Sequence, residues 1–296
     1  MSLVAVDWGT SSLRGARIDD TGRVIEERSA PQGILMVLAG QFPAVFDSVF
    51  ADWMRPADSF CLISGMAGSQ QGWAEAPYET CPADLSRLAR RLHWIETGRI
   101  AIVPGLSDEQ GGVPDVMRGE EVQIFGAMRL TGIATGLFVL PGTHNKWATV
   151  RDGRVTGFRT CMTGEFYAVL SQHSILGRTM QADAPLDEPA FLRGVAVADN
   201  GEGLLHNAFG ARTLALFKRL PAPALASYLS GILIGEELRA QPLKGAESVV
   251  LIGAAALTTR YALALKTFGV GTRILGAEAT WAGAHALYTV LRKQSA

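Results

Sequence analysis

Apolar residues recur along the chain in two patterns: short continuous runs, which are typical of buried strands, and positions three or four residues apart, which are typical of helices. The runs predict strands over residues 3–6, 13–18, 23–28, 59–64, 100–103, 137–140, 146–150, 155–160, 248–252 and 272–275. The helical spacing predicts helices over residues 41–54, 84–92, 117–130, 166–176, 187–199, 203–217, 222–238, 254–268 and 278–292. Strands followed by helices of this length indicate an α/β fold.

Two stretches of the chain have the same order of parts. Residues 4–14 (VAVDWGTSSLR) and 138–147 (FVLPGTHNKW) each read as an apolar strand that runs into Gly-Thr and then into a second strand. A polar turn follows each second strand, Asp20-Thr21-Gly22 in the first copy and Asp152-Gly153 in the second. Asp-Gly between alternating apolar residues is a strong hairpin signal. The two similar units predict a duplicated architecture, with one copy in each of two domains.

The Gly-Thr turns are candidate phosphate-binding elements. Glycine lets the backbone approach a ligand closely, successive N–H groups can then point at an anion, and the hydroxyls of Thr10 and Ser11 add donors. Asp7 ends the first strand, where its carboxylate could hold a divalent cation directly or through water. Two such turns facing each other would hold a polyphosphate between domains. The alternative is that both are ordinary hairpins with polar turns, because single short motifs have a high false-positive risk.

The composition narrows the class of protein. The length of 296 residues suggests about two domains, and a hydrophobic content of 48% is sufficient for a sizeable core. The net charge of -1 excludes a strong basic field, so we expect no nucleic-acid partner and no attraction to acidic membranes. The longest apolar run, at 249–257, is too short for a membrane span, and no signal peptide is recognisable. The 3 scattered cysteines fit neither a disulfide framework nor a zinc site, so we expect a cytoplasmic location.

Two further stretches of the chain contain residues that could bind a nucleotide or act in catalysis. The strand over 248–252 ends in Gly253-Ala254, where a flat group could lie against the backbone beside a helix N-terminus that favours phosphate. Close packing of the strand on the helix would explain the same small residues. Asp115 and Glu120 lie at the start of the predicted helix over 117–130. Either carboxylate could be a general base for a substrate hydroxyl, or Asp115 could simply be the N-cap of the helix.

A polar, glycine-rich loop over residues 64–73 follows a predicted strand. It could line a sugar pocket in which Trp73 stacks on the substrate, or it could be a surface turn. Glu165 could reach the same pocket, or it could only be a favourable acidic residue at a helix start. The motifs of P-loop nucleotide binding, dinucleotide binding, zinc proteases and serine hydrolases do not occur in the sequence.

The order of these parts resembles the superfamily of sugar kinases, hexokinase, actin and chaperone ATPases. The matching parts are a first phosphate loop, a connecting helix, a second phosphate loop, an adenosine loop and a second connecting helix, at residues 7–14, 119–129, 141–146, 252–256 and 279–288. More closely, the chain resembles the 2-dehydro-3-deoxygalactonokinase family in the stretches DWGT (7–10), GMAGS (65–69), GW (72–73), APY (76–78), VMRGEE (116–121), PGTHNKW (141–147) and MTGE (162–165). Together these stretches are specific, whereas any one alone is weak.

This resemblance implies an α/β fold of two actin-like (ribonuclease H-like) domains, each a mixed sheet flanked by helices, with a nucleotide cleft between them. The N-terminal domain would comprise residues 1–115, joined by the C-terminal helix 279–296, and the C-terminal domain residues 116–278. The implied activity is ATP-dependent phosphorylation of the 6-hydroxyl of 2-dehydro-3-deoxy-D-galactonate, with Mg²⁺ as the metal. The product would feed an aldolase in galactonate breakdown.

The resemblance also implies roles for individual residues. Asp7 would bind the metal, and Asp115 is the first candidate for the general base and Glu120 the second, because several related sugar kinases carry Asp just before this helix. The expected nucleotide-binding residues are Asp7, Gly9, Thr10, Ser11, Arg14, Gly142, Thr143, His144, Lys146, Gly253 and Ala254. The expected substrate-binding residues are Gly65, Met66, Trp73, Arg118 and Glu165.

The chain departs from the superfamily pattern at two places. Pro141 stands near the position where Asp usually precedes Gly-Thr in the second phosphate loop, which argues against a metal role for this loop. Gly253-Ala254-Ala255 replaces the paired glycines of the adenosine loop, which leaves less bare backbone for an adenine.

Two alternative functions stay open. One is a kinase for another small acid sugar, and the other is a regulatory module that binds a nucleotide but transfers nothing. The presence of both a candidate base and a candidate sugar loop favours an enzyme. A homodimer and the preferred epimer of the sugar acid also stay open.

Overall fold

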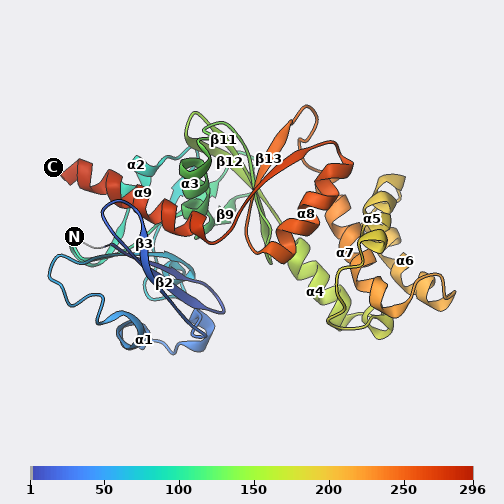
Figure 1. Ribbon diagram of the computed structural model, residues 1–296, viewed down its shortest axis with the longest axis horizontal. Helices are drawn as coiled ribbons and strands as arrows, with labels where there is room; N and C mark the ends of the chain where they lie inside the picture. The colour runs from blue at the N-terminus through green and yellow to red at the C-terminus, as the bar shows by residue number, and fades with distance from the viewer. Residues whose placement is uncertain (1–2, 296) are drawn as a thin grey trace. The chain divides into compact units, whose positions relative to one another are not determined.

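The computed structural model describes residues 3–295, which form an α/β protein with two larger sheets and one small sheet (Figure 1). Contacts divide the chain into two compact units. Unit 1 contains the described residues up to Phe138, Ala148–Arg159 and the residues from Leu275 onward, whereas unit 2 contains Val139–Trp147 and Thr160–Ile274. The division into domains at residue 115 that the resemblance implies stays a prediction.

The six-stranded sheet of unit 1 is organised around strand β1. In spatial order its strands are β3 (Val24–Ala30), β2 (Leu13–Ile18), β1 (Leu3–Trp8), β4 (Phe60–Gly65), β7 (Ile100–Ile102) and β6 (His93–Glu96). β1 pairs antiparallel with β2 and parallel with β4, and the register places Asp7 beside Ser64 and Trp8 beside Gly65. The carboxyl ends of β1 and β4 therefore lie at the same edge of the sheet, where both polar loops predicted from the sequence begin.

The five-stranded sheet repeats this order. Its strands are β12 (Arg154–Cys161), β11 (Asn145–Arg151), β10 (Gly136–Leu140), β13 (Ser248–Ile252) and β14 (Gly271–Leu275). In both sheets the first strand lies between the next strand along the chain and a later strand, and the third strand of the hairpin unit is at the edge. Asp152 and Gly153 both have positive φ angles, 48° and 76°, as a tight hairpin turn of the Asp-Gly type requires. The repeated order of strands predicted from the sequence is confirmed, whereas one copy in each of two domains stays a prediction.

The helices agree closely with the predicted segments. In unit 1 they are α1 (Phe42–Phe50), α2 (Leu85–Arg90), α3 (Glu120–Thr131) and α9 (Glu278–Ser295). In unit 2 they are α4 (Thr163–His173), α5 (Glu188–Val197), α6 (Leu204–Leu216), α7 (Ala222–Arg239) and α8 (Ala255–Thr267).

Because residues 105–114 are rich in Gly, Asp and Pro, the sequence predicts a loop there, followed by the helix from residue 117. This prediction is wrong in part. The small sheet consists of β5 (Tyr78–Thr80), β8 (Gly105–Asp108) and β9 (Asp115–Met117), with Asp115 beside Asp108 in an antiparallel pair. Because residues up to Met117 pair as a strand, helix α3 begins only at Glu120, and its N-cap is Gly119 with a φ of 100°.

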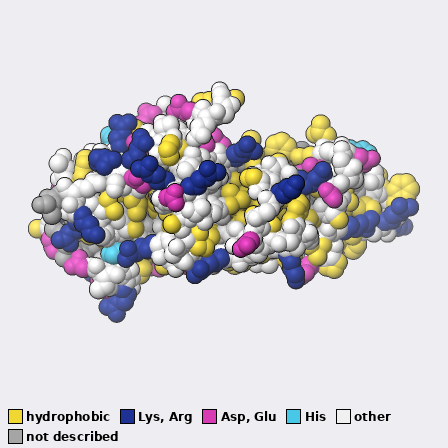
Figure 2. Space-filling model, turned by 90° about the horizontal axis from the view of Figure 1, so that it is seen from above, with side chains coloured by type: hydrophobic (Ala, Val, Ile, Leu, Met, Phe, Trp, Pro, Cys, Tyr) yellow, Lys and Arg dark blue, Asp and Glu magenta, His cyan; other side chains and the backbone are white. Residues whose placement is uncertain are grey.

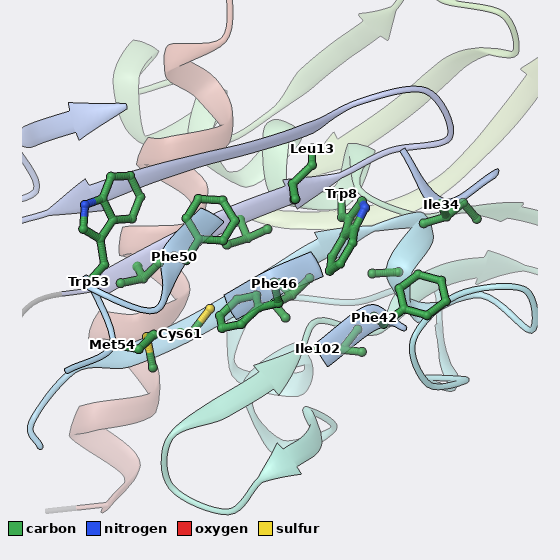
Figure 3. Close-up of a cluster of buried hydrophobic side chains, with 14 of the residues drawn as sticks. Trp8, Leu13, Ile34, Phe42, Phe46, Phe50, Trp53, Met54, Cys61 and Ile102 are labelled. Atoms are coloured by element: carbon green, nitrogen blue, oxygen red, sulfur yellow. The ribbon is translucent and has the colours of Figure 1, made fainter. Parts of the chain in front are cut away.

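An aromatic core supports the end of β1 (Figure 3). Helix α1 buries Phe42, Phe46 and Phe50, which are spaced by four residues and so share one face. The Trp8 ring is fully buried 5.4 Å from the Phe42 ring, and its indole N–H donates to the carbonyl of Gln32 at 2.8 Å. Burial of such rings stabilises each by roughly 2–3 kcal/mol relative to exposure. The core therefore fixes the strand end from which the first Gly-Thr turn departs.

Helices α3 and α9 cross at contact distance in unit 1 (Figure 1). A Cβ atom at Gly126 would overlap the carbonyl oxygen of Ala279, and one at Gly283 would overlap the carbonyl oxygen of Val122. Small residues in the predicted helices over 117–130 and 278–292, Gly126-Ala127 and Gly283-Ala284, predict such a close crossing, and the structure confirms it.

The surface mixes charges of both signs. On the face shown in Figure 2, Lys and Arg side chains are interspersed with Asp and Glu, as expected from a net charge of -1. Within residues 3–295 we find no helix whose length and apolar character would suffice to cross a membrane.

Candidate functional site

In unit 1, the first Gly-Thr turn connects β1 to β2. The N–H of Gly9 donates to the carbonyl of Ser12 at 2.9 Å, which closes the turn, and the side chains of Thr10 and Ser11 are exposed. The segment after β3 also contacts the turn, because the N–H of Ile34 donates to the carbonyl of Gly9 at 3.0 Å. The turn is thus held by its backbone while its hydroxyls face outward, an arrangement that suits anion binding.

Asp7 lies directly before this turn and forms an ion pair with Arg14 of β2. The Asp7 side chain is 13% exposed and that of Arg14 is 41% exposed, so the pair lies at the protein surface. The other carboxylate oxygen of Asp7 points to Gly65, where a Cβ atom would lie 3.2 Å from it. The structure therefore brings together the residue predicted to bind metal and a residue predicted to offset phosphate charge.

The donor set around Asp7 suits Mg²⁺ better than a metal held by protein alone. Among residues 3–295, no group of three or more His, Cys, Asp or Glu side chains could hold a metal ion. Mg²⁺ commonly takes one or two carboxylates and completes its shell with water and substrate phosphates. One carboxylate beside a candidate phosphate-binding turn fits that pattern.

The polar loop after β4 begins at Gly65, which has a φ of 89° that favours glycine, and continues through Met66. Trp73 is partly buried and packs on the Phe46 ring at 5.4 Å and on the Trp8 ring at 6.1 Å. Its ring contacts are therefore with the core of unit 1. Stacking of Trp73 on a sugar stays a prediction.

Arg118 is 9% exposed and holds the far side of this loop. It donates to the carbonyl of Ala76 at 2.8 Å, and its guanidinium lies 4.3 Å from the centre of the Tyr78 ring. Two of its nitrogens, Nε and Nη1, are buried without a hydrogen-bond partner. These contacts fix the loop, and a role for Arg118 in binding the substrate stays a prediction.

Three carboxylates surround the start of α3, and the structure separates their positions. Asp115 lies in strand β9 and accepts a hydrogen bond from the N–H of Val116, so the interpretation of Asp115 as the helix N-cap is wrong. Glu120 accepts from the N–H of Arg118 at 2.9 Å. The Cβ position of Gly119 lies 3.1 Å from Gly65, which places this helix start beside the polar loop and Asp7.

Glu121, the third of these carboxylates, is not among the site residues expected from the sequence. It is fully buried, and one of its carboxylate oxygens accepts from the N–H of Gly119 at 2.7 Å while the other has no partner. Burial, together with the smaller effect of the charge of Glu120, raises the pKa of Glu121 to about 8. A helical position four residues before buried Phe125 was the available signal.

In unit 2, the second Gly-Thr turn connects β10 to β11. The side-chain oxygen of Asn145 accepts from the N–H of Gly142 at 2.7 Å, and a Cβ atom at Gly142 would meet nothing within 4 Å. The N–H of Glu165, in the first turn of α4, donates to the carbonyl of Thr143 at 3.0 Å. The turn thus keeps an open face at Gly142, where a phosphate could approach the backbone.

Two basic side chains of this turn, His144 and Lys146, have partners within unit 2. His144 and Glu165, predicted for phosphate and for substrate, contact each other through Nε2 and Oε2 at 2.5 Å, with side chains 50% and 43% exposed. Lys146 is 6% exposed and donates from Nζ to the hydroxyl of Thr160 at 2.7 Å. The ammonium of Lys146 is thus buried in β11.

The adenosine-loop candidates lie next to the same turn. β13 ends at Ile252, Ala254 is the N-cap of α8, and a Cβ atom at Gly253 would lie 3.4 Å from the carbonyl oxygen of Pro141. A cavity of about 90 Å³ adjoins the turn, lined by residues that include Gly142, Asn145, Thr163, Tyr167, Arg260 and Tyr261. Backbone, hydroxyl and guanidinium donors therefore converge beside the second Gly-Thr turn.

Glu237, on helix α7, is not among the residues expected from the sequence. It is buried among polar side chains beneath the second turn and accepts hydrogen bonds from four of them, including Asn145. A charged residue within the apolar sequence LIGEEL of a long helix was the only signal.

Comparison with known proteins gives consistent matches. The family model described as 2-keto-3-deoxy-galactonokinase matches residues 7–287. A probable 2-dehydro-3-deoxygalactonokinase of Rhizobium meliloti (strain 1021) is 39% identical over 282 residues, which are 93% of this chain and 92% of that protein. The 2-dehydro-3-deoxygalactonokinase of Escherichia coli (strain K12) is 33% identical over 286 residues, 95% of each chain. A crystal structure assigned to this activity in Sinorhizobium meliloti superposes with a TM-score of 0.88 at 37% identity, covering 96% of this chain and 97% of that one.

Proposed function

Because the chain belongs to the 2-keto-3-deoxy-galactonokinase family, we propose that it transfers the γ-phosphoryl group of ATP to the 6-hydroxyl of 2-dehydro-3-deoxy-D-galactonate. The product is 2-dehydro-3-deoxy-6-phospho-D-galactonate, a substrate for an aldolase-type cleavage in galactonate breakdown. The observation that carries this proposal is the family match over residues 7–287, which includes both Gly-Thr turns and the start of α3.

Phosphoryl transfer depends on positioning and charge neutralisation more than on covalent chemistry. The two Gly-Thr turns supply backbone N–H groups for the phosphates, and the exposed hydroxyls of Thr10 and Ser11 add donors to the first turn. Ala254, at the N-terminus of α8, places further N–H groups beside the second turn. His144 is half-exposed on that turn, where it can donate to a phosphate oxygen.

Asp7 would hold Mg²⁺, which when bound neutralises charge on the phosphates. Its ion pair with Arg14 keeps the carboxylate at the edge of the turn before nucleotide binding. Once the carboxylate is engaged, the guanidinium of Arg14, which is already 41% exposed, is available to a phosphate oxygen. In the nucleotide complex, Asp7 would thus contact the metal and Arg14 a phosphate oxygen.

The attacking hydroxyl needs a carboxylate that aligns it and takes its proton late in transfer. Asp115 remains our first candidate and Glu120 the second; their carboxylates accept hydrogen bonds from the backbone N–H groups of Val116 and Arg118, respectively. Gly65, Met66, Trp73, Arg118 and Glu165 are the proposed substrate contacts. Glu121 is excluded as a direct base because it is fully buried.

A coupled ADP-release assay tests this proposal. The purified protein is given ATP, Mg²⁺ and each member of a panel of 2-dehydro-3-deoxy sugar acids that differ in the configuration of one hydroxyl. We expect the highest kcat/KM with 2-dehydro-3-deoxy-D-galactonate. A clearly higher kcat/KM with another acid sugar would identify that sugar as the substrate. ATP binding without ADP release in the presence of any member of the panel would indicate a non-catalytic module.

A further inference from the structure

The carboxylate of Glu237 accepts four hydrogen bonds from side chains, and it is buried. Only 6% of the residue is exposed. Its Oε1 accepts from the indole N–H of Trp147 at 2.5 Å, and its Oε2 accepts from the amide of Asn145 at 2.8 Å and from the hydroxyl of Tyr261 at 2.5 Å. The hydroxyl of Thr163 also donates to Oε2. Burying a carboxylate is costly unless donors surround it, and here four donors do.

The donors connect Glu237 to the second Gly-Thr turn by two routes. Asn145 bridges directly, because its amide nitrogen donates to Glu237 while its oxygen accepts from the N–H of Gly142. Thr163 begins helix α4, whose first turn packs on the Gly-Thr turn: a Cβ atom at Gly164 would overlap the carbonyl oxygen of Gly142. One carboxylate on α7 therefore holds both the turn and the helix start that packs against it.

We propose that Glu237 is a positioning residue that holds residues 141–145 in the shape that receives the phosphates of ATP. The inference rests on the proposed phosphate-binding role of this turn. The N–H groups of a turn bind an anion well only when their directions are fixed beforehand. The N–H of Gly142 donates to Asn145, and Asn145 donates to Glu237, so these two hydrogen bonds constrain the turn.

The site requires a carboxylate, because all four side chains that bond to the Glu237 carboxylate donate to it. A glutamine has the same shape but one oxygen and one NH₂ group, and the NH₂ group would face a donor in either orientation. The donors lower the pKa of Glu237, while burial, the larger effect, raises it. Glu237→Gln therefore keeps the volume of the side chain and disrupts one side of the network.

The test compares Glu237→Gln with Asn207→Ala in steady-state kinetics and thermal unfolding. Asn207 is a matched control: it is 3% exposed, lies in unit 2 and donates to Glu236, the neighbour of Glu237. Its amide also donates to Val197 and Asn200, which are not part of the turn. We expect Glu237→Gln to raise the KM for ATP at least about tenfold, which is about 1.4 kcal/mol of binding free energy, with the KM for the sugar acid unchanged. Asn207→Ala should lower the Tm without changing the KM for ATP.

A double variant separates positioning from general loss of stability. If Glu237 acts through Asn145, the effects of Glu237→Gln and Asn145→Ala on the KM for ATP should not add. The KM of the double variant should then lie within about twofold of that of the single variant with the higher KM. An unchanged KM for ATP in folded Glu237→Gln, or an equal rise in Asn207→Ala, would overturn the inference. If Glu237→Gln does not fold, Tyr261→Phe removes one donor and keeps the ring; a several-fold rise in the KM for ATP supports the inference, and no rise contradicts it.

Gly142→Val distinguishes this inference from the proposed function beneath it. If that change leaves ATP binding intact, the turn does not bind phosphate, and the role of Glu237 fails with it. If Gly142→Val weakens ATP binding but Glu237→Gln does not, the phosphate-binding role stands and only the positioning role of Glu237 is wrong.

Discussion

Glu121 should make the stability of the protein depend on pH in a way that one substitution removes. Its pKa is raised from 4.5 to about 8 by burial first and by the charge of Glu120 second. Between these values the folded protein keeps the proton that the unfolded chain has released. Since the folded state binds more protons, stability is full below pH 4.5 and falls by about 1.4 kcal/mol per pH unit until about pH 8. From pH 5.5 to 7.5 the loss is about 3 kcal/mol.

Glu121→Gln cannot ionise, so the variant should lack this slope. A glutamine buries an NH₂ group where Glu121 has an unpartnered oxygen, and that cost is the same at every pH. The difference in unfolding free energy between variant and parent should therefore grow by about 3 kcal/mol in favour of the variant from pH 5.5 to 7.5.

Urea unfolding followed by tryptophan fluorescence measures this difference. Trp147 lies in unit 2 and the other tryptophans lie in unit 1, so the signal reports chiefly on the unit that contains Glu121. Glu75→Gln, on an exposed position of the same unit, is the matched control and should show no change with pH. A difference for Glu121→Gln that stays constant between pH 5.5 and 7.5 would refute the reasoning.

Three substitutions test the proposed catalytic parts. Asp7→Asn removes the charge proposed to hold Mg²⁺ and should lower kcat at least about a hundredfold in a Mg²⁺ titration of turnover; near-normal kcat with the same Mg²⁺ dependence rules the role out. Gly142→Val fills the open face of the second turn, so calorimetry should show weaker ATP binding and intact sugar-acid binding; unharmed ATP binding would leave the turn a purely structural element. Asp115→Asn should keep both substrate affinities and lower kcat by roughly two to four orders of magnitude; turnover within a few-fold of the parent rejects Asp115 as the base and leaves Glu120 to be tested by Glu120→Gln.

Local sequence signals predicted the repeated framework. The hairpin at Asp152-Gly153 follows from a backbone preference of two residues, and strand β13 has the predicted bounds because a continuous apolar run meets glycine at its end. Gly126 and Gly283 predicted a close helix crossing because small residues are what such a crossing requires. The resemblance carried by the short motifs predicted the family that the comparisons then confirmed.

Features that depend on distant partners could not be predicted. Strand β9 has three residues, too few for a periodic pattern, and forms because Asp115 and its neighbours pair with β8. The sequence suggested a cap for Asp115 because that pairing is invisible in one dimension. Glu237 contacts Asn145 across 92 positions of the chain, and no local pattern indicates such a bond.

The position of the new phosphate on the product tests the central claim most directly, because ADP release alone does not distinguish transfer to sugar from hydrolysis. The product of ATP and 2-dehydro-3-deoxy-D-galactonate can be examined by two-dimensional NMR that correlates phosphorus with protons. The proposed function predicts a phosphate coupled to the two protons on carbon 6. A phosphate on another carbon, or inorganic phosphate as the only new species, would contradict it.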